Sequence, residues 1–220
     1  MTAGADLAAR LTALKRVNDP ILGVVSPAEM AKASLLWPSG NWAAIEALSV
    51  AEASGRRLEE YLFTPAPDAD PLPAGITTLP VAVVYDGDSA RLYSAHELVP
   101  SRAAILQIDP NLKTIADDDF LSGYFDCLHR ADLEGTLACF ELDGYMQHSN
   151  GRRYYAPDRL REDFIGMFAS NGGRIDVKFA NVLDDGHVRA FECYMPSGRP
   201  AVAVYQRGVT GKIAAIRICL

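Results

Sequence analysis

The residue with the clearest capacity for chemistry is a histidine on a predicted strand in the second half of the chain. His148 lies in the segment YMQHS, where strand alternation puts it on the same face as Met146 and opposite Tyr145. Because the reference pKa of histidine is about 6.5, its imidazole can accept a proton near neutral pH. His148 is therefore a candidate general base, and the alternative is a structural histidine in the wall of a pocket.

A glutamate on a later predicted strand is the second candidate. Along residues 189–195, Phe191 and Cys193 share one face and Glu192 lies on the other. If Glu192 faces an apolar cavity, desolvation raises its pKa, which is typical of functional sites. The alternative is that it lies on the outer face of the sheet or pairs with a neighbouring arginine at the sheet contact. The sequence leaves both placements open.

Metal and cofactor chemistry has no support in the sequence. The four cysteines lack CxxC spacing, no two histidines have the helical i, i+4 spacing of a zinc site, and no acidic cluster indicates calcium. The chain also lacks a glycine-rich dinucleotide motif, a P-loop and a serine nucleophile elbow. We expect buried free thiols, no metal and no cofactor.

Length and composition indicate a globular protein. A chain of 220 residues, of which 49% are hydrophobic, suits one large domain or two small ones. The net charge of −7 argues against nucleic acid as a partner. The chain has no apolar run of the roughly 18 residues that a membrane-spanning helix needs, and its amino terminus lacks the order of a signal peptide. We expect a soluble cytoplasmic protein with no membrane partner.

The helices that must position these residues are clearest in the second half. Apolar residues at helical spacing predict helices over 120–130 and 133–140, with N-cap candidates at Asp117–Asp119 and Asp132. A third helix should begin at Pro157. Its apolar stripe consists of Leu160, Phe164, Met167 and Phe168, and this stripe predicts a core contact.

The strands of the second half follow from turn residues and from alternation. A turn at Asp143–Gly144 should precede the strand of His148, and Asn150–Gly151 predicts a tight hairpin turn into RRYYA. Four later segments alternate with period two and predict an antiparallel meander: RIDVKFANV, HVRAFECYM, RPAVAVYQR and KIAAIRICL.

Segments of the first half repeat segments of the second. Residues 81–92 align without gaps to residues 202–213, and residues 55–65 align to residues 186–196. Near the amino terminus a single helix candidate, Ala5–Val17, stands where the second half has two helices and a hairpin. We interpret the first half as a shortened copy of the second, and chance similarity between short hairpins is the alternative.

Three segments carry a resemblance to a known family: YFDCLHRADLEGTLACF, NGGRIDVKFANVLDDGHVRAFE and AVAVYQRGVTGKIAAIRI. With the order of two helices, a hairpin, a third helix and a meander, they make residues 117–220 resemble the SnoaL-like branch of the nuclear transport factor 2 superfamily. The resemblance implies an α+β cone of three helices packed on a curved, mainly antiparallel sheet. Residues 1–116 would then be a truncated copy of this fold plus a linker near 99–117.

The resemblance also implies a ligand and an assembly. In such a cone the helices and the concave sheet face enclose an apolar pocket, so the expected ligand is an apolar small molecule. Family members commonly pair sheet to sheet, which implies either a homodimer or an intramolecular pseudo-dimer.

Relatives with known chemistry suggest roles for particular residues. In relatives similar to ketosteroid isomerase, a helix tyrosine and a protonated acid bind an oxyanion beside a carboxylate base. By resemblance, Tyr124 matches the tyrosine, His148 stands in place of the base, and Ala203 replaces the acid. The resemblance to limonene-epoxide hydrolase is incomplete, because Ile218 follows Arg217 where that enzyme has an acid. SnoaL-like cyclases use an Asp/His arrangement, and His148 with Tyr124 could do related work.

Three hypotheses follow. The leading one is a small-molecule-binding protein that lacks the catalytic acids of its relatives. The second is an enzyme in which His148 is the base and Tyr124 the hydrogen-bond donor, acting on a carbonyl compound or an epoxide. The third is a non-catalytic interaction module whose pocket is filled by large side chains. Besides those two residues, the predicted pocket consists of Tyr145, Phe164, Phe168, Phe191, Glu192 and Tyr205.

Overall fold

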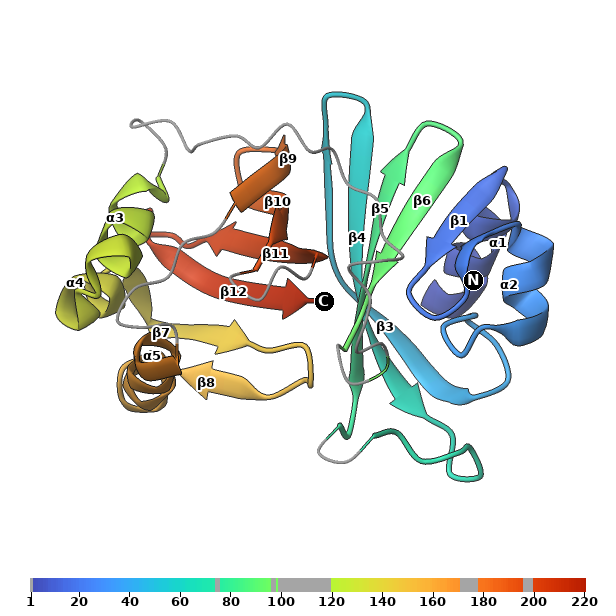
Figure 1. Cartoon of the computed structure of the whole chain (residues 1–220), viewed down its shortest axis with the longest axis horizontal. Coiled ribbons are helices and arrows are strands. Elements are labelled where there is room, and N and C mark those ends of the chain that lie inside the picture. The colour runs from blue at the N-terminus through green and yellow to red at the C-terminus, as the bar shows by residue number, and fades with distance from the viewer. Residues whose placement is uncertain (1, 74–75, 96–97, 99–119, 171–177, 196–199) are drawn as a thin grey trace. The chain divides into compact units, whose positions relative to one another are not determined.

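The computed structural model describes residues 2–73, 76–95, 98, 120–170, 178–195 and 200–220 (Figure 1). The chain divides into two compact units, and the main border between them falls within residues 99–119. The expected domain boundary at 116/117 and the expected linker therefore lie outside the described residues. Each unit is described by itself below, as the first half and the second half.

The first half contains a mixed sheet of six strands. Its elements are α1 Ala3–Thr12, β1 Arg16–Asp19, β2 Gly23–Val25, α2 Pro27–Ala33, β3 Trp42–Ala53, β4 Arg56–Pro65, β5 Leu79–Asp86 and β6 Ser89–Tyr93. The strand order is β2-β1-β6-β5-β4-β3. Strands β1 and β6 are parallel, and the other neighbours are antiparallel.

Helices α1 and α2 cover one face of this sheet (Figure 1). The side chain of Thr2 caps α1, and Ser26 and Glu29 form a capping box at the start of α2. The apolar residues of both helices pack on the sheet, and burial of each large side chain contributes roughly 1.5–3 kcal/mol. The main residues of this core are Leu7, Leu11, Val17, Met30, Phe63, Leu79, Val81, Val83 and Leu92.

The second half contains a sheet of the same strand order. Its elements are α3 Ser122–Arg130, α4 Leu133–Ala138, β7 Phe140–Gln147, β8 Arg153–Tyr155, α5 Asp158–Ser170, β9 Lys178–Asp184, β10 Val188–Tyr194, β11 Pro200–Arg207 and β12 Ile213–Cys219. The strand order is β8-β7-β12-β11-β10-β9, and β7 and β12 are parallel. When the strands are numbered from β1 in the first half and from β7 in the second half, the strand orders of the two sheets are identical. The element order that the resemblance implied for residues 117–220 is present.

The expected amino-terminal helix over Ala5–Val17 is wrong in its second part. Helix α1 ends at Thr12, and the chain continues into the β1–β2 hairpin. The carboxylate of Asp19 explains the turn, because its Oδ1 atom accepts hydrogen bonds from the backbone N–H groups of Ile21 (2.7 Å) and Leu22 (2.8 Å). The first half therefore has the hairpin that the sequence interpretation lacked, and within the described residues it has one helix fewer than the second half.

The expected turn at Asp143–Gly144 is also wrong, because both residues lie inside β7. The pairing of β7 with β12 shifts between Phe140 and Tyr145, so the intervening residues form a bulge. A Cβ atom on Gly144 would lie 2.9 Å from the carbonyl oxygen of Ile213, so only glycine fits this close approach.

The helix caps were predicted in part. The side chain of Asp132 caps α4, since its Oδ1 atom accepts from the backbone N–H of Gly135 at 2.9 Å. Helix α3 begins after Leu121, which makes no side-chain cap. The other predicted caps, Asp117–Asp119, lie outside the described residues.

The sequence alignment of the two halves places Leu58 on Arg189 and Val84 on Tyr205. Both pairs are direct neighbours in their own sheets, Leu58 with Val84 on β4 and β5, and Arg189 with Tyr205 on β10 and β11. The alignment therefore identifies equivalent strands in equivalent register.

The alignment nevertheless assigns the wrong faces. Tyr205 lies on the helix-covered face of the second sheet, where it contacts Tyr124, whereas in the first half Val83 and not Val84 belongs to the core beneath the helices. A shift of one residue on each strand restores the faces and pairs Glu59 with Arg189 and Val83 with Tyr205. A slip of one residue turns every side chain of a strand to the other face, because successive side chains alternate between the two faces of the sheet.

Candidate functional site

Aromatic rings fill the interior of the second half, between its helices and its sheet. Neighbouring ring centroids lie 4.6–6.4 Å apart, mostly edge to face. Each such pair contributes about 0.5–1.5 kcal/mol beyond the area it buries. We call this set the ring cluster; it consists of Tyr124, Phe125, Phe140, Phe164, Phe168, Phe179, Phe191 and Tyr205.

Tyr124 lies in the middle of the ring cluster. It is 2% exposed and contacts the rings of Phe140, Phe164 and Tyr205. Burial, followed by the electrostatic effects of Cys139 and Asp163, raises the pKa of Tyr124 well above its ordinary value. Its hydroxyl therefore keeps its proton at neutral pH and can only act as a neutral hydrogen-bond donor or acceptor.

His148 pairs with an aspartate that the sequence interpretation did not identify. Its Nε2 atom lies 2.8 Å from Oδ2 of Asp163 on α5. The side chain of His148 is 31% exposed and that of Asp163 is 11% exposed, so the pair lies at the edge of the interior. A carboxylate that accepts from Nε2–H leaves Nδ1 of the neutral ring as an acceptor. We call His148 and Asp163 the dyad.

Two further contacts fix the position of His148. Its backbone N–H donates to the carbonyl of Arg152 at 2.9 Å, across the β7–β8 hairpin. Its ring meets the ring of Tyr154 edge to face, with centroids 5.1 Å apart. His148 is therefore held by its backbone N–H, by the ring of Tyr154 and by its Nε2 atom. It makes no hydrogen bond to Tyr124, although the two were predicted to work together.

The sequence did contain an indication of Asp163. It lies three residues after Leu160 and four before Met167, on the side of α5 that carries the predicted apolar stripe. Leu160, Phe164 and Phe168 are buried as predicted. A carboxylate beside such a stripe must find a partner, because an unpaired buried charge is costly.

Tyr145 lies on the face of the sheet opposite the ring cluster. It pairs in register with Ala215 on β12, while its neighbour Met146 is 1% exposed and faces the helices. The Tyr145 ring packs on Tyr155 with centroids 5.5 Å apart, and Nη1 of Arg217 donates to its hydroxyl at 3.5 Å. Tyr145 therefore does not join the predicted pocket residues Phe164, Phe168, Phe191 and Tyr205, which the structure brings together.

Glu192 also lies on the opposite face. Its neighbour in the chain, Phe191, belongs to the ring cluster, and Glu192 accepts a hydrogen bond from Nδ2 of Asn181 on β9 at 2.7 Å. Of the two placements that the sequence left open, the structure has the outer face. The carboxylate is buried and hydrogen-bonded there, and it is not an acid inside an apolar cavity.

The interior of the first half holds a different polar group. The carboxylate of Glu59 is fully buried and accepts hydrogen bonds from Arg57 Nε (2.6 Å), Tyr61 Oη (2.6 Å), Tyr85 Oη (2.9 Å) and Arg10 Nε (3.0 Å). Burial alone would raise the pKa of Glu59, but these hydrogen bonds and the charge of Arg10 outweigh it and lower the pKa. With its acceptor sites occupied, Glu59 is an internal anchor.

Neither a metal-ligand cluster nor a membrane-spanning helix is found in the described part of the chain. The described residues include no group of three or more His, Cys, Asp or Glu side chains placed to hold a metal ion. No helix among them is both long and apolar enough to cross a membrane. Each of the four cysteines is a free thiol.

No protein-family model and no curated protein matches the sequence. Solved structures that are similar include SnoaL-like and nuclear-transport-factor-2-like proteins. A SnoaL-like protein of unknown function from Burkholderia thailandensis is 13% identical over 45% of this chain and 88% of its own, with a TM-score of 0.40. A nuclear-transport-factor-2-like protein from Cytophaga hutchinsonii is 12% identical over 48% and 90%, with a TM-score of 0.35. A candidate polyketide cyclase from Sinorhizobium meliloti is 14% identical over 47% and 94%, with a TM-score of 0.38.

These likenesses concern the fold and transfer no activity. The fold class rests on the molecule itself: an α+β chain with two six-stranded mixed sheets and five helices in its described part. The order of helices and strands expected from the sequence for the second half is present in this chain, and the similar structures named above, which cover 45–48% of it, carry no further argument.

Proposed function

We propose that the second half binds a small, mainly apolar molecule through one polar group, and that the dyad recognises this group. The observation that supports the proposal most strongly is the 2.8 Å contact between His148 and Asp163, which leaves the imidazole 31% exposed. This partial exposure leaves the ring accessible to a small molecule.

The surroundings of the dyad favour an amphipathic ligand. Asp163 directly precedes Phe164 of the ring cluster, and its charge contributes to the raised pKa of Tyr124. An apolar body could therefore contact the aromatic edge while a carbonyl or hydroxyl reaches the imidazole. Because the described rings already pack against one another, we expect a ligand of one or two rings at most.

A matched pair of probes tests this proposal. Acetophenone and ethylbenzene share a skeleton, and only acetophenone has a carbonyl. Ligand-observed NMR should show that wild-type protein prefers acetophenone by about tenfold, the value of one good polar contact. His148→Ala should abolish the preference, and His187→Ala, which removes an exposed histidine of the same half, should keep it. Equal binding of both probes to wild type would contradict the proposal.

Proton transfer is a second candidate function for the same residues. It is favoured by the orientation of His148, since a carboxylate on Nε2 fixes the imidazole as it does in many general bases. Such a base would remove a proton from the carbon next to a carbonyl. Deuterium exchange into the methyl group of acetophenone in D₂O, followed by NMR, should then be at least about 100-fold faster with wild type than with His148→Ala.

We also propose that the two halves are an internal repeat. The shared strand order and the shared register of β4–β5 and β10–β11 support it. The predicted pairing of sheets within one chain stays a prediction. Native mass spectrometry tests it, because a monomer mass is expected for an intramolecular pseudo-dimer and a doubled mass for a homodimer.

A further inference from the structure

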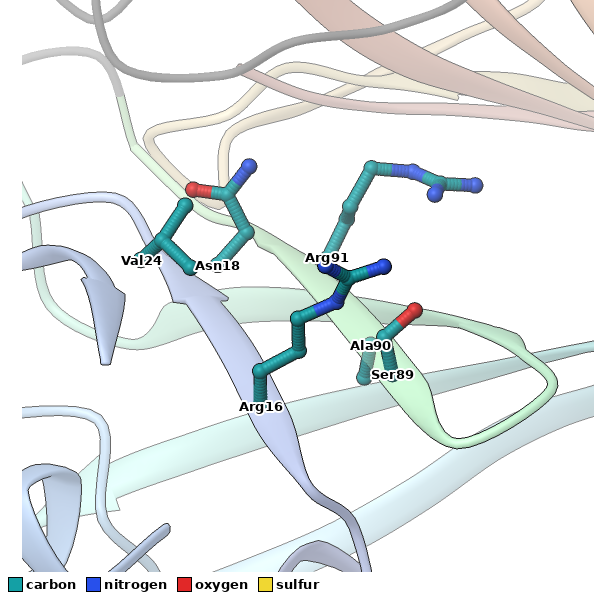
Figure 2. A pocket seen from close by; sticks show the side chains of 6 residues that line it. All are labelled: Arg16, Asn18, Val24, Ser89, Ala90 and Arg91. Atoms are coloured by element: carbon teal, nitrogen blue, oxygen red, sulfur yellow. The ribbon is translucent and has the colours of Figure 1, made fainter. Parts of the chain in front are cut away.

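A pocket of about 190 Å³ lies in the first half, where β1, β2 and β6 meet (Figure 2). It is smaller than the roughly 300–1,000 Å³ of sites for drug-sized ligands. The parallel register pairs Arg16 with Ser89 and Asn18 with Arg91. Because residues two apart on a strand share a face, all four polar side chains point to the same side of the sheet. Val24 and Ala90 complete the lining.

The lining is positively charged, although the whole chain has a net charge of −7. It includes two arginines and no carboxylate. Arg91 pairs with Asp86 at 3.5 Å and is not without partners, and Asp86 also pairs with Arg56 at 3.6 Å. Arg16 has no ion pair among the described residues. In Figure 2 the guanidinium group of Arg16 reaches from β1 toward Ser89 and Arg91 on β6. Two guanidinium groups and a hydroxyl are suited to bind an oxyanion.

An unsatisfied acceptor adds a second requirement. Asn18 is 9% exposed, and its buried Oδ1 atom has no hydrogen-bond partner within the described structure. Buried polar atoms without a partner are uncommon and costly, at about 1–3 kcal/mol each. A ligand that lies beside Asn18 can satisfy this atom only by donating a hydrogen bond.

We propose that this pocket binds a small oxyanion that also carries a hydroxyl donor. Hydrogenphosphate has this chemistry, and so do short hydroxycarboxylates. The anionic oxygens lie between Arg16 and Arg91 with Ser89 as a further donor, and the ligand hydroxyl donates to Oδ1 of Asn18. The site is independent of the dyad, so the function proposed for the second half can fail without affecting it.

Isothermal titration calorimetry with four probes tests the proposal. Inorganic phosphate and glycolate carry a hydroxyl donor, whereas sulfate and acetate are matched oxyanions without one near neutral pH. We expect saturable binding of phosphate, glycolate or both, at least about tenfold tighter than of the matched control. Binding of phosphate alone indicates hydrogenphosphate itself as the ligand, and binding of glycolate alone indicates a hydroxy acid.

Variants locate the binding. Arg16→Gln should weaken it by at least about tenfold, because one charge-assisted hydrogen bond is lost, while Lys32→Gln removes an exposed charge from α2 and should change nothing. Asn18→Asp keeps the shape of the side chain, adds a negative charge and should abolish binding. The proposal is overturned if neither phosphate nor glycolate binds, if sulfate and acetate bind equally well, or if Arg16→Gln binds like wild type.

Discussion

The two halves share one sheet order but differ in the polar group that their helices cover. In the first half Glu59 is 0% exposed and accepts hydrogen bonds from four side chains. In the second half the interior is aromatic, and its polar pair, His148 with Asp163, lies at the edge. A buried carboxylate whose acceptor sites are all occupied stabilises the fold, whereas a partly exposed imidazole can still contact a ligand. Access to solvent therefore distinguishes the internal anchor, Glu59, from the ligand site that we propose at the dyad.

The largest expected effect is on the ring cluster. Phe191→Ala should lower the free energy of unfolding by about 3–5 kcal/mol, because it leaves a cavity among rings that contact one another. Urea unfolding followed by circular dichroism measures the change. A loss below about 1 kcal/mol would show that the second half is not held by these contacts.

Loss of the anchor should have the next largest effect. Glu59→Gln should cost about 2–3 kcal/mol, since it removes a charge from a fully buried, fully hydrogen-bonded position. Asp163→Asn should cost at most about 1 kcal/mol, because its pair is partly open to water. If the two variants reverse this order in urea unfolding, the assignment of anchor and site is wrong.

The loss of unfolding free energy at acidic pH should also depend on Glu59. Its folded pKa is lowered, so its stabilising contribution is fully present above the unfolded pKa of about 4.3 and is lost as the pH falls through the folded pKa. Unfolding free energies of wild type should therefore drop in that range. In Glu59→Gln the drop should be shallower, and equal slopes for both proteins would contradict the lowered pKa.

The smallest effect is expected at the surface. Arg161 on α5 pairs with Glu134 on α4, with Nη2 donating to Oε2 at 2.9 Å, and the two side chains are 38% and 73% exposed. Solvent and salt screen such a pair, so Arg161→Ala should unfold at the same urea concentration as wild type within error. A clear loss would mean that surface pairs matter here as much as the interior.

The sequence predicted the elements whose pattern is local. Alternation predicted β9 to β12, and the apolar stripe predicted the buried face of α5. The β1–β2 hairpin was missed because it depends on the Asp19 carboxylate accepting from the backbone N–H groups of Ile21 and Leu22, and on pairing with β6, which is distant in sequence. The sequence predicts a turn at Gly144 because glycine is common in turns. Glycine is also found at β-bulges, and the structure has a bulge there.

The candidate site was predicted less completely than the fold. His148 could be identified from its strand, but Asp163 could not be assigned to it, since the two meet only when α5 packs beside β7 and β8. The faces of Tyr145 and Glu192 depend on which side of the sheet the helices cover. Alternation tells which residues share a face and does not tell which face is covered.

The most direct measurement of the central claim uses ¹⁵N-histidine-labelled protein and observes the four imidazoles by NMR while acetophenone is added. A His148→Gln spectrum assigns the critical signals. We predict that the His148 resonances shift with acetophenone and not with ethylbenzene, while those of the other histidines stay in place. Shifts of equal size at the other histidines, or no shift at His148 at saturating probe, would contradict a ligand site at the dyad.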